Sequence, residues 1–121
     1  DVAIRGAFGN TGQLCLSTER IFVDARIERE FTDALIAGVE HLALGSVIGW
    51  GSEMGALITP NQMARTEEHV RDAVEKGATV LIGGERRTDL GPLMYAPTVL
   101  AGVTDDMDGG VPCWSGNGWR V

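Results

Sequence analysis

The chain has 121 residues, and its 10 basic and 17 acidic side chains give a formal net charge of −7. This charge would repel a phosphate backbone, so we do not expect nucleic acid as a partner. The sequence has no run of 18 apolar residues and no export signal, which predicts no membrane partner and a cytoplasmic location. Its two cysteines, Cys15 and Cys113, fit free thiols in a reducing compartment better than a disulfide framework.

The front of the chain predicts a helix that has barely begun. Val2, Ile4 and Phe8 fall on one helical side, and the first residue is Asp1 rather than Met. The length suffices for one domain with its own core. We expect a fragment whose front end has been cut.

A lone cysteine follows on a loop punctuated by glycines, because residues 8–15 read Phe-Gly-Asn-Thr-Gly-Gln-Leu-Cys. Gly12 lets the backbone approach a ligand closely, and the amide of Cys15 could point at the oxygen of a tetrahedral adduct. A free thiol is mostly protonated at neutral pH, so an attacking cysteine needs an electropositive or amide-rich setting. The alternative is that Cys15 is a small buried hydrophobe. The surrounding pattern favours the nucleophile.

Two elements are expected after the loop. Residues 20–23, Arg-Ile-Phe-Val, are rich in β-formers and predict a buried strand. From Ile27 to Leu42 apolar residues recur at spacings of three and four, which predicts a helix with one buried face. Gly38 within it implies either close helix packing or a weak point, since glycine costs about 1 kcal/mol relative to alanine.

The glycine-rich residues 49–55 resemble a dinucleotide-binding fingerprint, and Val47-Ile48 could end a strand before it. A phosphate-binding turn must open a helix, but Pro60 follows too soon after Gly55 to leave room for one. We therefore interpret this segment as a connecting loop.

The second half predicts one helix and two strands. Thr59-Pro60 suits a helix start, and the helix is expected to run to about Lys76 and to stop at Gly77. Residues 79–82 predict a strand, and residues 96–100 predict another whose Pro97 lies at an edge or at the strand start. The order of elements predicts an α/β fold with an incomplete sheet.

Side chains on this half are assigned by spacing and charge. The helix has an apolar side that consists of Met63, Val70, Ala73 and Val74. Outside it we expect Glu67 to pair with Arg71 and Asp72 to pair with Lys76. Residues 85–87, Glu-Arg-Arg, are interpreted as a solvated tip.

Most of the chain, from its start to about Met107, resembles the aldehyde dehydrogenase family. The resemblance rests on Phe8, Asn10, Gly12, Gln13 and Cys15 at fixed spacing, and on residues 55–60, 75–78, 83–84 and 96–99. Residues 1–107 are therefore expected to be a partial catalytic domain, and residues 108–121 a divergent, disordered Gly/Trp tail. The narrower resemblance is to the succinate-semialdehyde dehydrogenase branch.

The resemblance implies oxidation of an aldehyde to a carboxylic acid with NAD or NADP. In this family a cysteine thiolate forms a thiohemiacetal, hydride leaves for the cofactor, and a water activated by glutamate hydrolyses the thioester. Cys15 matches the nucleophile, and Leu14 and Leu16 would help line the aldehyde pocket, whereas Gln13 and Arg20 are interpreted as framework. The family's glutamate base, oxyanion asparagine and nucleotide-binding sheet precede the matched region. We therefore expect this chain alone to bind no cofactor.

Two departures from the family pattern affect function. Many succinate-semialdehyde dehydrogenases carry an arginine before the motif asparagine, where it can pair with the substrate carboxylate, but this chain has Gly9. After Met107 the family continues into a Glu-Glu-x-Phe-Gly-Pro segment, which is replaced here from Asp108 onward. A shifted reading frame is one hypothesis for that replacement.

Other functions remain as alternatives. An inactive truncated or frameshifted remnant would expose apolar surface, which predicts self-association. A cysteine-dependent binding or acyl-transfer module is disfavoured, because no histidine partner for Cys15 is identifiable. His41 and His69 lie on separate expected helices, which disfavours a zinc site, and no serine has the Gly-x-Ser-x-Gly elbow of hydrolases.

Overall fold

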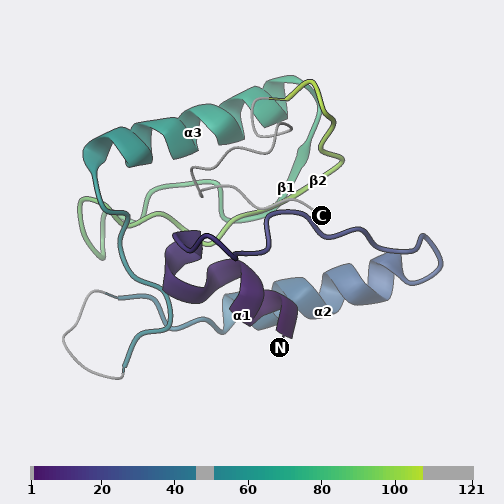
Figure 1. The fold of residues 1–121 in the computed structure, drawn as a ribbon, viewed down its shortest axis with the longest axis horizontal. Coiled ribbons are helices and arrows are strands. Elements are labelled where there is room, and N and C mark those ends of the chain that lie inside the picture. The colour runs from purple at the N-terminus through teal and green to yellow at the C-terminus, as the bar shows by residue number, and fades with distance from the viewer. Residues whose placement is uncertain (1, 46–50, 108–121) are drawn as a thin grey trace.

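The computed structural model describes residues 2–45 and 51–107, so the predicted tail at 108–121 and the proposed strand end at 47–48 lie outside the described residues. The elements are α1 (Val2–Phe8), the short 3-10 helix η1 (Gly9–Gly12), α2 (Glu28–Glu40), α3 (Pro60–Glu75), β1 (Thr79–Ile82) and β2 (Val99–Ala101) (Figure 1). Helices surround a two-stranded sheet. The predicted α/β class with an incomplete sheet is confirmed.

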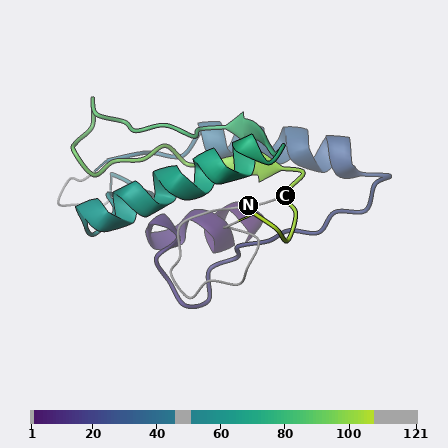
Figure 2. The ribbon, with the colours of Figure 1, turned by 90° about the horizontal axis from the view of Figure 1, so that it is seen from above.

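The sheet separates α3 from the α1–α2 pair (Figures 1 and 2). β1 and β2 run antiparallel, with an irregularity in register between Val80 and Ile82. Val80 and Leu100 pack in clusters with α3, whereas Leu81 and Val99 pack with α1 and α2. This alternation is the ordinary consequence of successive strand side chains pointing to opposite faces.

The second strand begins later than its sequence pattern predicts. Residues 96–98 belong to no strand, and β2 starts at Val99. A Cβ atom added to Gly83, whose φ is +76°, would lie 2.2 Å from the carbonyl oxygen of Pro97. The close approach of these two backbone segments therefore requires glycine at position 83.

The predicted helix from Ile27 is confirmed as α2, with Leu35 and Val39 buried. Its glycine reflects close packing rather than a weak point. A Cβ added at Gly38 would lie 2.2 Å from Cδ1 of Ile4 on α1. The absence of a side chain at position 38 therefore allows α1 and α2 to touch.

The predicted third helix is also confirmed, with both of its ends. The Thr59 side chain accepts a hydrogen bond from the Gln62 amide at 3.2 Å, and Gly77 has φ +104° just beyond the last turn. Its buried side differs from the prediction at one position, because Val74 is exposed beside the buried Ala73. With 3.6 residues per turn, Val74 lies just beyond the edge of the helix face that contains the buried residues.

The prediction of a buried strand at residues 20–23 is wrong. The structure assigns no strand to these residues, and Phe22 is 90% exposed. β-forming residues gain stability from strand neighbours and burial, and residues 20–23 instead line a groove of 640 Å³ beside Leu81 and residues 101–105. Phe22 therefore lies at the molecular surface, whereas Ile21 packs against the core cluster of α1 and α2.

The charged pairs on α3 are only partly those expected. Asp72 and Lys76 pair at 2.7 Å as predicted. Glu67 pairs with Arg86 instead of Arg71, because the loop after β1 returns beneath α3. Residues 85–87 are therefore not a freely solvated tip, since Arg86 is tied to the helix and Arg87 pairs with Asp89 at 2.7 Å.

Candidate functional site

Cys15 lies in a turn that immediately follows η1, and its thiol is free and exposed. Its two neighbours are also exposed, Leu14 by 45% and Leu16 by 80%. The alternative of a small buried hydrophobe therefore does not describe Cys15 in this structure. Its assignment as a nucleophile, and that of Leu14 and Leu16 as pocket residues, stay predictions.

The chain enters this turn through an unusual backbone conformation. Asn10, Thr11 and Gly12 have φ values of +51°, +59° and +68°, so the chain reverses direction directly after α1. Glycine adopts this left-handed region readily, but a β-branched threonine does so rarely and at a cost of roughly 1 kcal/mol or more. The Thr11 hydroxyl accepts a hydrogen bond from the Gly55 amide at 3.1 Å, which helps offset that cost.

The side chain of Gln13 attaches the turn to a distant segment. Its Nε2 donates to the carbonyl oxygen of Ala56 at 3.3 Å, and its Oε1 accepts from the amide of Ile58 at 3.2 Å. The prediction that Gln13 is a framework residue is consistent with this geometry. Thr11 and the partner residues of Gln13 were not identified from the sequence, because more than 40 residues separate the two segments.

The far side of the turn is attached to α1. The Ser17 amide donates to the carbonyl of Leu14 at 3.1 Å and closes the turn, and the Thr18 amide donates to the carbonyl of Gly6 at 2.9 Å. A Cβ at Gly6 would lie 2.9 Å from the Thr18 hydroxyl oxygen, so α1 and the segment that contains Thr18 lie close together. Cys15 is thus held between two anchored points while its own side chain faces outward.

Arg20, also interpreted as framework, pairs with Asp105 at 3.3 Å near the end of β2. Both residues line the groove of 640 Å³, whereas Cys15, Leu14 and Leu16 do not. Because none of the three predicted site residues lines this groove, it is not supported as the aldehyde pocket.

Part of the glycine-rich segment, residues 51–55, lies among the described residues. Residues 51–55 form bends and a bridge between Leu44 and Met54, and no helix starts until Pro60, so the loop interpretation is confirmed for this described part. Within residues 2–45 and 51–107, no three His, Cys, Asp or Glu side chains form a group suited to a metal ion. His41 has Nδ1 2.6 Å from the carbonyl of Ala37, at the end of α2.

None of the helices in the described part of the chain has the length and apolarity needed to cross a bilayer.

Comparison with known sequences finds a match over nearly the whole chain. The sequence profile of the aldehyde dehydrogenase family matches residues 1–109. A protein of Mycolicibacterium smegmatis, whose name assigns it succinate-semialdehyde dehydrogenase activity with NADP+, is 45% identical over 106 residues. That match covers 88% of this chain and 20% of the relative, so the chain spans about a fifth of the length of the curated relatives it matches.

Comparison with solved structures gives the same result. A double mutant of betaine aldehyde dehydrogenase from Staphylococcus aureus, in complex with NAD+, superimposes with a TM-score of 0.91 at 31% identity, covering 100% of this chain and 25% of that one. Succinate-semialdehyde dehydrogenase from Burkholderia pseudomallei gives a TM-score of 0.89 at 37% identity, covering 98% and 24%. The described elements therefore have the arrangement found in these enzymes.

Proposed function

Because this chain belongs to the aldehyde dehydrogenase family, we propose that it supplies Cys15 as the nucleophile of an enzyme that oxidises an aldehyde to a carboxylic acid with NAD or NADP. The single observation that supports this most is the exposed free thiol on a turn anchored at both ends. An attacking group must be accessible to substrate and fixed relative to it, and this turn meets both requirements.

The covalent step assigned to the turn is the addition of Cys15 to the aldehyde. The thiolate sulfur forms a bond to the carbonyl carbon, the C=O π electrons move to oxygen, and that oxygen takes up a proton to give a thiohemiacetal. The backbone amide of Cys15 is proposed to donate a hydrogen bond to the oxygen as its negative charge develops. NAD or NADP accepts hydride in the parent reaction, and the part proposed for this chain ends at the adduct.

Leu14 and Leu16 are proposed to contact the carbon chain of the aldehyde. Both flank Cys15 in sequence, and both expose apolar surface. Contact with a substrate would remove some of that surface from water, at about 25 cal/mol per Å².

Iodoacetamide labelling near neutral pH tests the nucleophile directly. We expect Cys15 to react faster than Cys113 in the same molecule, with the two peptides measured by mass spectrometry. An aldehyde should slow the labelling of Cys15 by forming the reversible adduct and should leave Cys113 unaffected. Equal labelling rates, with no protection by aldehyde, would contradict the proposal.

Succinate semialdehyde is the proposed substrate of the parent enzyme, on the strength of the activity named for the relatives. Gly9 is the position to test, because a Cβ added there meets no atom within 4 Å. Gly9→Arg should strengthen the protection of Cys15 by succinate semialdehyde relative to butanal, since the guanidinium can pair with the carboxylate. Gly9→Ala is the matched control and should not change the preference. If Gly9→Arg also leaves the preference unchanged, position 9 does not face the carboxylate.

The second candidate is a non-catalytic, self-associating protein. It is favoured by exposed apolar side chains, because Phe22, which lines the 640 Å³ groove, is 90% exposed and Ile27, next in sequence to the groove residue Glu28, is 53% exposed. Sedimentation velocity over a range of concentrations should then show dimers or larger species, and Phe22→Ser should reduce them. A monomer at all concentrations would rule this candidate out.

A further inference from the structure

The amide group of Gln13 makes a two-point contact with the backbone of another segment. One end donates to the carbonyl of Ala56 at 3.3 Å and the other accepts from the amide of Ile58 at 3.2 Å. The side chain therefore binds backbone groups two residues apart through a donor and an acceptor, as a neighbouring strand would. A glutamine amide offers a donor and an acceptor side by side in one plane, which suits this two-point contact.

The segment that Gln13 contacts is itself fixed. Between its two contact residues, the Leu57 amide donates to the carbonyl of Leu93 at 2.9 Å, and the Leu57 side chain is buried. The next residue, Thr59, caps the first turn of α3. Gln13 therefore ties the turn to a part of the molecule that is held by the packing around α3.

Few residues separate this attachment from the thiol. Cys15 lies two positions after Gln13, and the next anchor is the bond from the Thr18 amide to Gly6. Releasing Gln13 would leave the turn attached to the segment around residue 56 only through the Thr11 hydroxyl and the Gly55 amide, which lie farther from Cys15 along the chain. The direction of the Cys15 side chain depends on both attachments.

We propose that Gln13 is the positioning residue for Cys15, and that its paired hydrogen bonds to Ala56 and Ile58 hold the thiol in the orientation that attacks the aldehyde. This inference rests on the proposed function of Cys15. The inference goes beyond that function because it assigns control of the reaction rate of the thiol to Gln13. This side chain is uncharged and takes no part in proton transfer.

The test uses the full chain with Gln13→Leu, which removes both hydrogen bonds, and Gln13→Glu. At pH 7.5 the ionised carboxylate that Gln13→Glu introduces cannot donate to Ala56, but the protonated carboxyl group can donate to Ala56 and accept from Ile58. The matched control is Gln62→Glu, which makes the same chemical change at the chain's other glutamine. The reagent is 4,4′-dithiodipyridine, which reacts with thiols in acid as well as at neutral pH. The readout is the ratio of Cys15 to Cys113 labelling in each protein.

At pH 7.5 we expect Gln13→Leu and Gln13→Glu to lower this ratio on the order of ten-fold, the equivalent of one to two hydrogen bonds, and Gln62→Glu to leave it unchanged. At pH 4 the ratio for Gln13→Glu should recover most of the way to that of the unmodified chain, because a glutamic acid side chain is then mostly protonated, while Gln13→Leu should not recover. A purely structural loss would not be reversed by protonating one side chain. Far-UV circular dichroism and urea unfolding establish that each variant is folded at both pH values.

Amide hydrogen exchange at Ile58 separates this inference from the proposed function. If Gln13→Leu accelerates exchange at Ile58 but leaves the labelling ratio intact, the contact exists without positioning the thiol, and the inference is wrong. If Ile58 exchange is also unchanged, the contact itself is absent in solution, and the inference is equally wrong. If the unmodified chain labels Cys15 no faster than Cys113 and aldehyde gives Cys15 no protection, the proposed function fails whatever happens at Ile58.

Discussion

The turn around Cys15 and the α3 half of the molecule are stabilised by different forces. Around Cys15 the apolar side chains face outward, and polar contacts from Thr11, Gln13 and Thr18 fix the backbone. On α3 the large apolar side chains other than Val74 face inward, and Met63 is 1% exposed. Substitutions in the α3 half should therefore change the free energy of unfolding, whereas substitutions at the turn should chiefly change the reactivity of the thiol.

The largest effect is expected from truncating the α3 core. Met63→Ala should lower the free energy of unfolding by about 2 to 5 kcal/mol, because it removes a fully buried side chain and leaves a cavity. Urea unfolding measures the loss. The Cys15 labelling rate of the folded fraction should stay the same, and a change in that rate would break the separation between the two regions.

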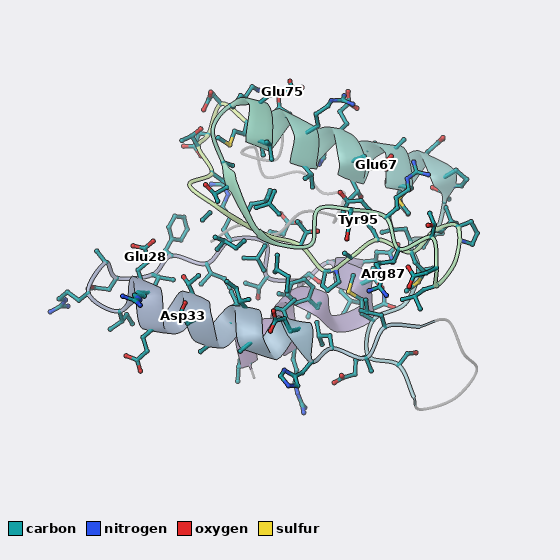
Figure 3. All side chains as sticks on the ribbon, turned by 180° about the vertical axis from the view of Figure 1, so that it is seen from behind. Glu28, Asp33, Glu67, Glu75, Arg87 and Tyr95 are labelled. Carbon is teal, nitrogen blue, oxygen red and sulfur yellow. The ribbon has the colours of Figure 1, made fainter. Side chains whose placement is uncertain are left out.

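The buried phenol of Tyr95 predicts a loss of stability in alkali. It lies beneath α3 (Figure 3), and burial, assisted by the Glu67 carboxylate, raises the pKa of Tyr95 to about 12. An unfolded tyrosine ionises near pH 10, so the unfolded state loses its proton first. Stability from the neutral phenol should be complete below pH 10 and fall by up to about 3 kcal/mol as the pH rises to 12.

This alkaline transition is measurable because Tyr95 is the only tyrosine in the sequence. The absorbance of tyrosinate should report its titration in the folded chain directly. Tyr95→Phe should flatten the dependence of unfolding free energy on pH in this window. A titration near pH 10 in the folded protein would show that the phenol is solvated.

A smaller effect is expected at the turn. Thr11→Ala should cost about 1 kcal/mol of unfolding free energy, because the Gly55 amide loses its acceptor at 3.1 Å. Hydrogen exchange of that amide should accelerate. Thr11→Ser keeps the hydroxyl and should preserve the protection. Slow exchange in both variants would mean that Gly55 is protected by something other than the Thr11 hydroxyl.

The smallest effect is expected from a partly exposed ion pair near the C-terminal end of α3. Asp72→Asn should lower the free energy of unfolding by no more than about 0.5 kcal/mol, although its pair with Lys76 is short, at 2.7 Å. Asp33→Asn on α2 (Figure 3) is the control, since its pair with Arg29 is longer, at 3.9 Å, and its side chains are more exposed than those of Asp72 and Lys76. High salt should remove the difference between the two variants, and a loss of several kcal/mol would contradict a surface role.

The elements that sequence analysis predicts well are those with local signals. Thr59-Pro60 and Gly77 mark the ends of α3 because capping and left-handed stops depend on a few adjacent residues. The helix that contains Gly38 is also predicted well, because the spacing of its apolar residues is a local signal. Cys15 and its glycine-rich loop are also readable locally, and the structure places the thiol on the surface.

Contacts between distant segments could not be predicted in this way. Residues 20–23 have β-forming side chains, but a strand also needs a neighbour, and sequence composition does not supply one. Glu67 has Arg71 at the right helical spacing and pairs instead with Arg86, which the return of the chain brings closer. The attachment of Gln13 to Ala56 and Ile58 depends on the same kind of long-range return.

The contact between Gly38 and Ile4 has a consequence for how variation in this chain is tolerated. A side chain at position 38 would force the Ile4 methyl aside, and α1 continues directly into η1 and the cysteine turn. A substitution at Gly38 on α2 would therefore displace α1, and through η1 it would change the orientation of the Cys15 thiol. Mutational scans scored by the reactivity of Cys15 should therefore find sensitive positions on α2 as well as in the turn itself.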